Sequence, residues 1–142
     1  MLLHKPGSAL RKVYVRGREV FYRGWQNVLS GGSSESATQV NLSAYIPLEA
    51  EKVYGNARFK GQNTVFNVNQ YVYGHIQLTT SDLWLIMATT VSTDGSNNWG
   101  SSFFAIPNIN QALYYKLQKG TVDIYGIQMN IDILGYTVKN GG

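Results

Sequence analysis

The chain has 142 residues, enough for one domain with its own core, and it contains no cysteine, which excludes disulfide frameworks, zinc–thiolate sites and thiolate nucleophiles. Ten tyrosines and fifteen glycines, among many Asn, Ser, Thr and Gln residues, favour strands joined by turns. The net charge of +4 is placed unevenly, because residues 1–24 hold six basic residues against the single acid Glu19 and the remainder is nearly neutral.

The N-terminal segment predicts a basic arm followed by a hairpin. Residues 1–11 show no periodicity and contain Pro6 and Gly7, which indicates an extended arm. Residues 13–15 and 20–22 predict two short strands on either side of a Gly-containing turn. The opening is too short in apolar residues for a signal peptide, and no stretch approaches the roughly 18 apolar residues of a membrane span.

We expect residues 1–24 to dock the protein onto an acidic protein surface. The basic residues that carry this expectation are Lys5, Arg11, Lys12, Arg16, Arg18 and Arg23. Nucleic-acid binding is the weaker interpretation of the same charges, because the sequence contains no recognition module.

Residues 25–142 predict a body of short strands. Residues 30–36 have the composition of a loop, residues 38–47 predict a strand that Pro47 ends, and residues 48–60 predict a turn and then a strand. Over residues 64–79 the apolar side chains take the even positions, which predicts strands with one buried face. Residues 83–91 are apolar on both faces, which predicts a central strand buried from both sides.

The last part of the chain contains the clearest pattern. After a polar loop over residues 92–102 and two short strands over 103–106 and 112–117, residues 121–138 alternate without interruption. The apolar positions are Tyr125, Ile127, Met129, Ile131 and Ile133, and a slip beside Gly135 predicts a β-bulge. A long half-buried strand needs a sheet beside it and a second layer above it. We therefore predict an all-β, antiparallel, jelly-roll-like β-sandwich with an N-terminal arm and hairpin; a small barrel is the nearest alternative.

The sequence offers no support for catalysis. His4 and His75 lack spaced partners of the kind found in metal motifs, and Glu49 and Glu51 fit a solvated turn better than a pair of glycosidase acids. The sequence therefore predicts a protein that is no enzyme and that holds no metal or cofactor.

Binding has more support. Tyr71, Tyr73 and His75 line the polar face of one predicted strand, and Trp99 lies in a polar loop. Exposed aromatic residues of this kind favour a contact between identical subunits, with a ligand such as a sugar as the second interpretation.

The order of segments resembles that of a known group of domains. VNLSAYIP at residues 40–47 precedes a turn and a strand, and ALYYKL at residues 112–117 precedes a terminal strand that closes with Gly135-Tyr136. Over residues 25–138 this arrangement resembles the small β-sandwich domains of tail fibres, tail needle knobs and head fibres of tailed bacteriophages.

The resemblance implies a structural protein of the virion, commonly a homotrimer, in the tail or on the particle surface. We expect the arm to dock on other virion proteins while the sandwich projects for host attachment, with a host surface glycan as a further partner. A capsid decoration protein that stabilises the head is the alternative in the virion, and a cellular carbohydrate-binding module is the alternative outside it.

Overall fold

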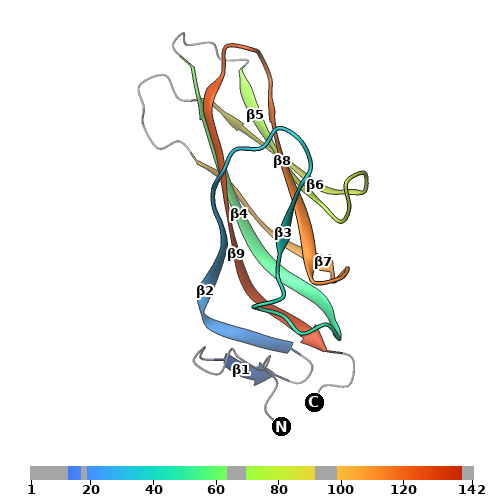
Figure 1. The fold of residues 1–142 in the computed structure, drawn as a ribbon. Coiled ribbons are helices and arrows are strands. Elements are labelled where there is room, and N and C mark those ends of the chain that lie inside the picture. The colour runs from blue at the N-terminus through green and yellow to red at the C-terminus, as the bar shows by residue number, and fades with distance from the viewer. Residues whose placement is uncertain (1–12, 17–18, 64–69, 92–98, 139–142) are drawn as a thin grey trace.

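The computed structural model describes residues 13–16, 19–63, 70–91 and 99–138, with the backbone alone for 13–16. Within these ranges the chain forms strands and no helix (Figure 1). The strands are β1 (Val13–Arg16), β2 (Glu19–Gly32), β3 (Thr38–Asn41), β4 (Ala50–Gln62), β5 (Tyr71–Gln77), β6 (Leu83–Thr90), β7 (Gly100–Pro107), β8 (Ala112–Lys119) and β9 (Tyr125–Val138).

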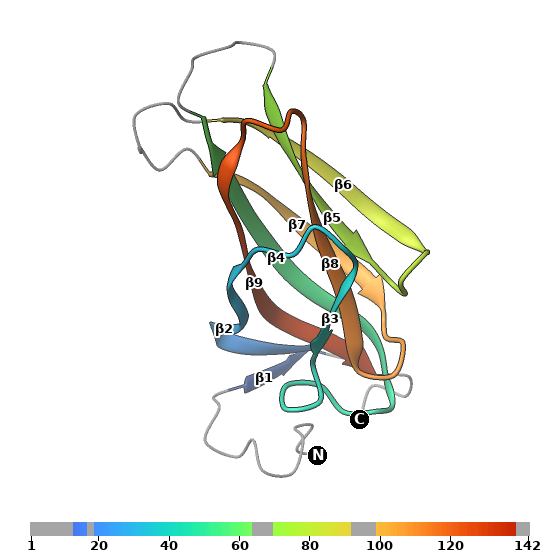
Figure 2. The same ribbon diagram turned by 45° about the horizontal axis from the view of Figure 1, so that its top comes forward.

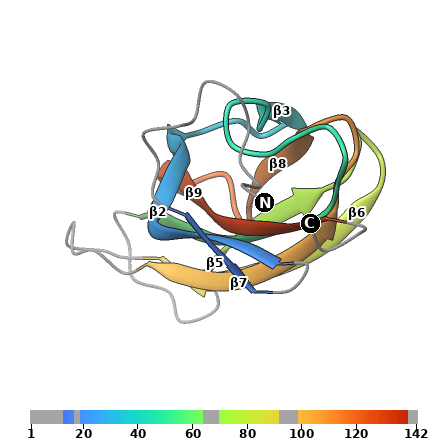
Figure 3. The ribbon, with the colours of Figure 1, turned by 90° about the horizontal axis from the view of Figure 1, so that it is seen from below.

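The strands form two antiparallel sheets that face each other. One has the order β1-β2-β9-β4-β7 and the other β3-β8-β5-β6. Seen along the strands in Figure 3, β3 and β8 lie across the core from β9. The chain changes sheet at every connection except β1–β2 and β5–β6, which is the jelly-roll arrangement. The predicted antiparallel β-sandwich is confirmed.

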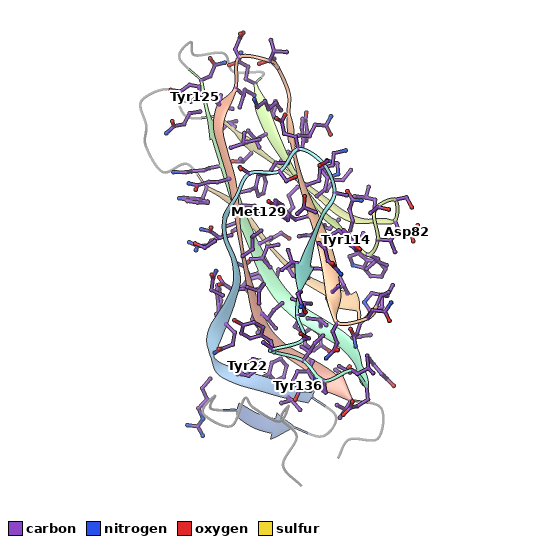
Figure 4. The ribbon with its side chains drawn as sticks, in the orientation of Figure 1. Tyr22, Asp82, Tyr114, Tyr125, Met129 and Tyr136 are labelled. Carbon is purple, nitrogen blue, oxygen red and sulfur yellow. The ribbon has the colours of Figure 1, made fainter. Side chains whose placement is uncertain are left out.

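The core follows from the alternation in β9. Met129, Ile131 and Ile133 are fully buried. Val53 and Phe59 of the neighbouring strand β4 and Ile76 and Leu117 of the opposite sheet belong to the same core cluster. Beside Leu134 the pairing of β9 with β4 shifts from Gly55↔Ile133 to Tyr54↔Gly135. This shift is the predicted bulge, and it returns Tyr136 to the core, where it is 1% exposed. Tyr125, which the pattern placed on the buried face, is 47% exposed. It is the first residue of β9 and lies at the end of the sandwich opposite Tyr136 (Figure 4).

The N-terminal hairpin is present and belongs to the five-stranded sheet. β1 and β2 pair from Val13↔Tyr22 to Arg16↔Glu19, as predicted. β2 then continues to Gly32 and pairs with β9 from Glu19↔Thr137 to Gly32↔Met129, with register shifts after Phe21, Asn27 and Leu29. The predicted boundary after residue 24 therefore falls inside a strand, because Val20 and Tyr22 belong to the same core as the residues after Trp25.

Two further boundaries differ from the sequence prediction. The strand predicted over residues 38–47 ends at Asn41, whose Oδ1 accepts a hydrogen bond from the Ser43 amide at 2.8 Å and so turns the chain. The turn also buries Leu42 and Ile46 completely. Within the predicted segment 64–79, residues 64–69 lie outside the described ranges, and the remainder forms β5 with Val72 and Ile76 inward.

The prediction for residues 83–91 was wrong. β6 is hydrogen-bonded to β5 alone and forms the margin of its sheet among the described strands (Figure 2). Its inward residue Met87 is 8% exposed, but Leu83, Trp84 and Ile86 are each about half exposed. β6 does carry apolar residues on both faces, but no described residue covers the second face.

Candidate functional site

The outer face of the four-stranded sheet brings together the residues predicted for binding on β5. Tyr71 and Tyr73 lie two residues apart on one face of β5, with ring centroids 6.4 Å apart. They share this face with Ile86 of β6 and with Lys116 and Gln118 of β8. We call this surface the tyrosine face. It contains a hollow of about 440 Å³ that is lined by Tyr73, His75, Ile86, Gln118, Lys119 and Gly120.

His75 and Gln77 on the same face are held by hydrogen bonds within the sheet. His75 is 8% exposed, and its Nε2 lies 3.2 Å from Gln118 Oε1. Burial lowers the pKa of His75, with a smaller contribution from the charge of Lys116, against the hydrogen bond of Gln118, which raises it. Gln77 donates from Nε2 to the carbonyls of Thr79 and Thr80. These two residues therefore position the tyrosine face, and Tyr71, Tyr73 and Gln118 supply its accessible groups.

Trp99 lies on the other sheet, away from the tyrosine face. Its ring makes cation–π contacts with two residues of β4. The Arg58 guanidinium carbon lies 5.5 Å and the Lys60 ammonium nitrogen 4.9 Å from the ring centroid. Arg58 and Lys60 are two residues apart and so point to the same side of β4. The structure thus separates the four residues that the sequence grouped as one contact face into two surfaces on opposite sheets.

The outer face of the five-stranded sheet carries aromatic residues that the sequence analysis did not single out. Phe21 and Tyr54 stack with centroids 5.7 Å apart, and Trp25 meets Phe103 edge to face at 5.8 Å. Trp25 is 53% and Phe103 64% exposed. We call Phe21, Trp25, Tyr54, Phe103 and Leu134 the aromatic face. A hollow of about 390 Å³ lies among Phe21, Tyr54, Phe103, Ala105 and Leu134.

The Trp25–Phe103 pair crosses two strands. Phe103 pairs with Asn56 of β4, Asn56 with Asp132 of β9, and Asp132 with Asn27 of β2. On β2 this row ends at Asn27, two residues after Trp25. Asn56 and Asp132 in the middle of the row are only 4% and 8% exposed although they face outward. Asp132 Oδ1 accepts a hydrogen bond from Asn27 Nδ2 at 3.1 Å, which satisfies the covered carboxylate.

One signal in the sequence pointed to this surface. Phe103 and Phe104 are adjacent in a predicted strand, so one of the two rings must face outward. Phe104 packs in the core and Phe103 is the outward ring. Phe21 and Tyr54, by contrast, are ordinary strand residues in the sequence, and only the register across β9 brings them together.

Most of the predicted docking residues lie outside what the structure describes. This applies to Lys5, Arg11, Lys12 and Arg18, and for Arg16 the structure gives only the backbone pairing with Glu19. Arg23 is exposed on β2, between the buried Tyr22 and the aromatic Trp25. The one described docking side chain is thus placed beside the aromatic face.

The described residues contain no group of three His, Cys, Asp or Glu side chains that could hold a metal ion. In the same part of the chain there is no helix with the length and hydrophobicity needed to cross a membrane. Glu49 and Glu51 flank Ala50 at the start of β4, outside the hollows described above.

Comparisons with known proteins give distant structural neighbours, of which two are described here. No family model matches the sequence, and no curated protein matches it. The fold is similar to the PRD1 vertex protein P5, with a TM-score of 0.42, 12% identity, and coverage of 81% of this chain and 96% of that one. It is also similar to the C-terminal family 22 carbohydrate-binding module of Clostridium thermocellum Xyn10B, with a TM-score of 0.33, 12% identity, and coverage of 97% and 87%. At these TM-scores neither neighbour carries an argument about function.

Proposed function

We propose that this chain is a non-enzymatic structural protein of a bacteriophage particle that docks through its N-terminal segment and the adjoining aromatic face. The observation that carries the proposal is the exposure of Trp25 and Phe103, whose rings are fixed against each other on a sheet surface. Fixed, half-exposed aromatic rings are the usual anchors of protein interfaces, because they bury a large area at little cost in side-chain entropy.

The position of the aromatic face favours docking at the N-terminal end of the sandwich. Phe21 lies within the hairpin, where it pairs with Tyr14 of β1, and Trp25 follows the hairpin on β2. A partner that meets the aromatic face therefore also meets Arg23, which would add attraction to an acidic surface.

The segments that carry the bacteriophage resemblance form one structural unit, which supports the same proposal. β3 pairs with β8 from Thr38↔Tyr115 to Asn41↔Ala112, which joins VNLSAYIP to ALYYKL. Gln111 fastens the turn after β3, since its carbonyl accepts from the Leu42 amide and its Nε2 donates to the Ile46 carbonyl.

Within the particle we propose a tail or fibre component that projects the sandwich for host attachment, and the resemblance implies a homotrimer. In the alternative role, as a capsid decoration protein, the chain would use the same docking surface and bind no host receptor. Purified protein that adheres to host cells supports attachment, whereas binding to particles alone supports decoration.

Docking is tested by adding purified protein to particles that were assembled without it. The double substitution Trp25→Ala and Phe103→Ala should reduce incorporation at least tenfold, because it removes the exposed anchors. Val122→Ala is the matched control, since Val122 is an apolar residue that is 92% exposed in the turn before β9. Equal incorporation of the double variant and the control would overturn the docking proposal.

Glycan binding on the tyrosine face is the second candidate function. The specific observation is the hollow beside Tyr73, which Gln118 and Lys119 also line. Rings and amides together suit the apolar faces and hydroxyl groups of a sugar. If a soluble host polysaccharide releases the bound protein from cells, and Tyr73→Ala abolishes that binding, this function is supported; binding that no sugar displaces argues against it.

A further inference from the structure

We propose that β6 is the surface through which copies of this chain associate, with the exposed side of β6 packed against β6 of another copy at a symmetry axis. This inference rests on the self-association that the proposed function includes, and it assigns that association to one strand.

The first argument is the pattern of the strand itself. β6 is apolar on both faces, but within the chain only Leu85, Met87 and Val91 turn toward the core. Leu83, Trp84 and Ile86 remain 48%, 48% and 51% exposed. A strand with apolar residues on both faces is typical of burial on both sides. None of the described residues 13–16, 19–63, 70–91 and 99–138 covers this second face, and a second copy can supply the missing layer.

The second argument is the free edge of the sheet. Among the described strands β6 is bonded to β5 only, and its sequence LWLIMATT contains no proline and no charged residue. Edge strands that stay in solvent are usually short or carry charges, proline or a strong bulge. β6 has eight residues, and its single irregularity lies at Trp84, where its register with β5 shifts. Among the described strands, the edge from Leu85 to Thr89 has no second strand paired with it.

The third argument concerns charge, and it identifies a second copy as the partner. At a symmetry axis each residue meets its own copies, so a charged residue there would face a like charge. β6 has no charge, and the neighbouring edge strand β7, which approaches it where Thr89 meets Gly100, has none either. The chain as a whole carries +4. The nearest cations on this face, Lys116 and Lys119, lie on β8 with β5 between them and β6. The uncharged edge formed by β6 and β7 is therefore where two positively charged copies can approach with little repulsion.

The margins β1 and β3 fit this role less well. β1 ends in Arg16, and β3 is four residues long. β6 also adjoins the tyrosine face through the pairs Tyr73↔Ala88 and His75↔Ile86. An interface that begins at β6 can thus extend over Ile86 toward Tyr73, which enlarges the apolar area around the axis.

The first test introduces charge at the proposed axis. Wild-type protein should scatter light with a mass that is a multiple of 15.8 kDa, and Trp84→Glu and Ile86→Lys should each give 15.8 kDa. Both side chains are half exposed, so the variants should keep a cooperative thermal transition. Val122→Glu, at an exposed apolar residue in the turn between β8 and β9, should retain the wild-type mass.

The second test does not depend on how well a charge is tolerated. Because the chain has no cysteine, Ile86→Cys provides its single thiol. If residue 86 meets residue 86 of another copy, mild oxidation should give a covalent dimer on a non-reducing gel, whereas Val122→Cys should stay uncrosslinked.

The outcomes separate this inference from the proposed function. In one outcome the wild-type protein oligomerises, Trp84→Glu and Ile86→Lys keep the wild-type mass, and Ile86→Cys forms no crosslink. That outcome would overturn the role of β6 and leave self-association standing. If the wild-type protein has a mass of 15.8 kDa and Ile86→Cys yields no dimer, the role of β6 and self-association are both overturned. Loss of assembly in the charged variants together with the crosslink would support β6 as the axis.

Discussion

Phe21 and Tyr54 stack across Gly135, although β9 separates their strands. Phe21 pairs with Gly135 on one side, Tyr54 pairs with it on the other, and the rings stand 5.7 Å apart with an angle of 23° between their planes. A Cβ atom at position 135 would lie 2.8 Å from Phe21 Cδ1 and 2.3 Å from the Val20 carbonyl oxygen. The absence of a side chain at Gly135 thus permits both the close strand pairing and the ring stack.

Gly135→Ala should therefore destabilise the protein by about 1–3 kcal/mol, the usual cost of forcing an extra methyl into a packed site. The measurement is the free energy of unfolding in denaturant. Gly24→Ala is the matched control, because a Cβ at Gly24 meets nothing within 4 Å. If the two substitutions have equal effects, then the packing around Gly135 is looser than the distances indicate.

The two faces of β9 should respond differently to truncation. Ile131 is fully buried among core residues, so Ile131→Ala should cost about 2–5 kcal/mol through lost burial and the cavity that remains. Gln128 lies on the outward face and is partly exposed, so Gln128→Ala should be nearly neutral. Chemical denaturation of both variants measures the contrast, and similar losses would mean that the faces of β9 are assigned wrongly.

The sequence predicted those features of the fold that depend on local pattern. Alternation in β9 and β5, the bulge beside Gly135 and the β1–β2 hairpin were all correct, because in each case the residues that pack together are close in sequence or share one period. The position of a strand within its sheet is a property of the topology. For that reason the sequence analysis predicted β6 as a central strand, whereas the pairing of the described strands shows β6 at the edge of its sheet.

The candidate surfaces were predictable to a smaller extent. Tyr71 and Tyr73 were found because they lie on one strand at a spacing of two residues. The aromatic face draws its rings from β2, β4 and β7, and its contacts depend on registers across β9 that no local pattern contains. Trp99 was grouped with Tyr71 because both looked like exposed aromatics, but the partners of Trp99 on β4 place it on the opposite sheet.

Stability should fall at high pH because of Tyr136. Burial raises the pKa of Tyr136 to about 12, with further contributions from Tyr22 and Glu49. The folded protein thus keeps this phenol protonated while the unfolded chain, with an ordinary pKa of about 10, releases the proton. The stabilisation is complete below about pH 10 and is lost as the pH rises toward 12.

The test compares the pH dependence of unfolding in wild type and in Tyr136→Phe. The phenylalanine variant keeps the ring beside Tyr22, where Figure 4 shows both side chains at the same end of the sandwich, but it has no proton to lose. Its stability should decline less steeply than that of wild type between about pH 10 and 12. Parallel curves would show that Tyr136 titrates normally in the folded protein.

The last prediction concerns how much of the N-terminus the fold requires. A chain beginning at Val13 retains β1 and all of β2, so it should unfold in a cooperative transition near the wild-type temperature. A chain beginning at Trp25 lacks Val20 and Tyr22, which are 1% and 6% exposed, and it loses the pairing of Val20 with Tyr136. Removal of two core side chains should cost on the order of 5 kcal/mol, which is enough to unfold many domains of this size.

Particle binding separates the structural role of this segment from its docking role. The chain beginning at Val13 should fold and yet bind less tightly to particles that lack the protein, because it has lost Lys5, Arg11 and Lys12. Its binding should also depend less on salt than that of the full chain, since fewer charges remain for salt to screen. If it binds as tightly as the full chain at every salt concentration, the basic arm has no part in docking, and the aromatic face with Arg23 is left to account for attachment. If the chain beginning at Trp25 melts like wild type, residues 1–24 are a separable segment and β2 folds without its first six residues.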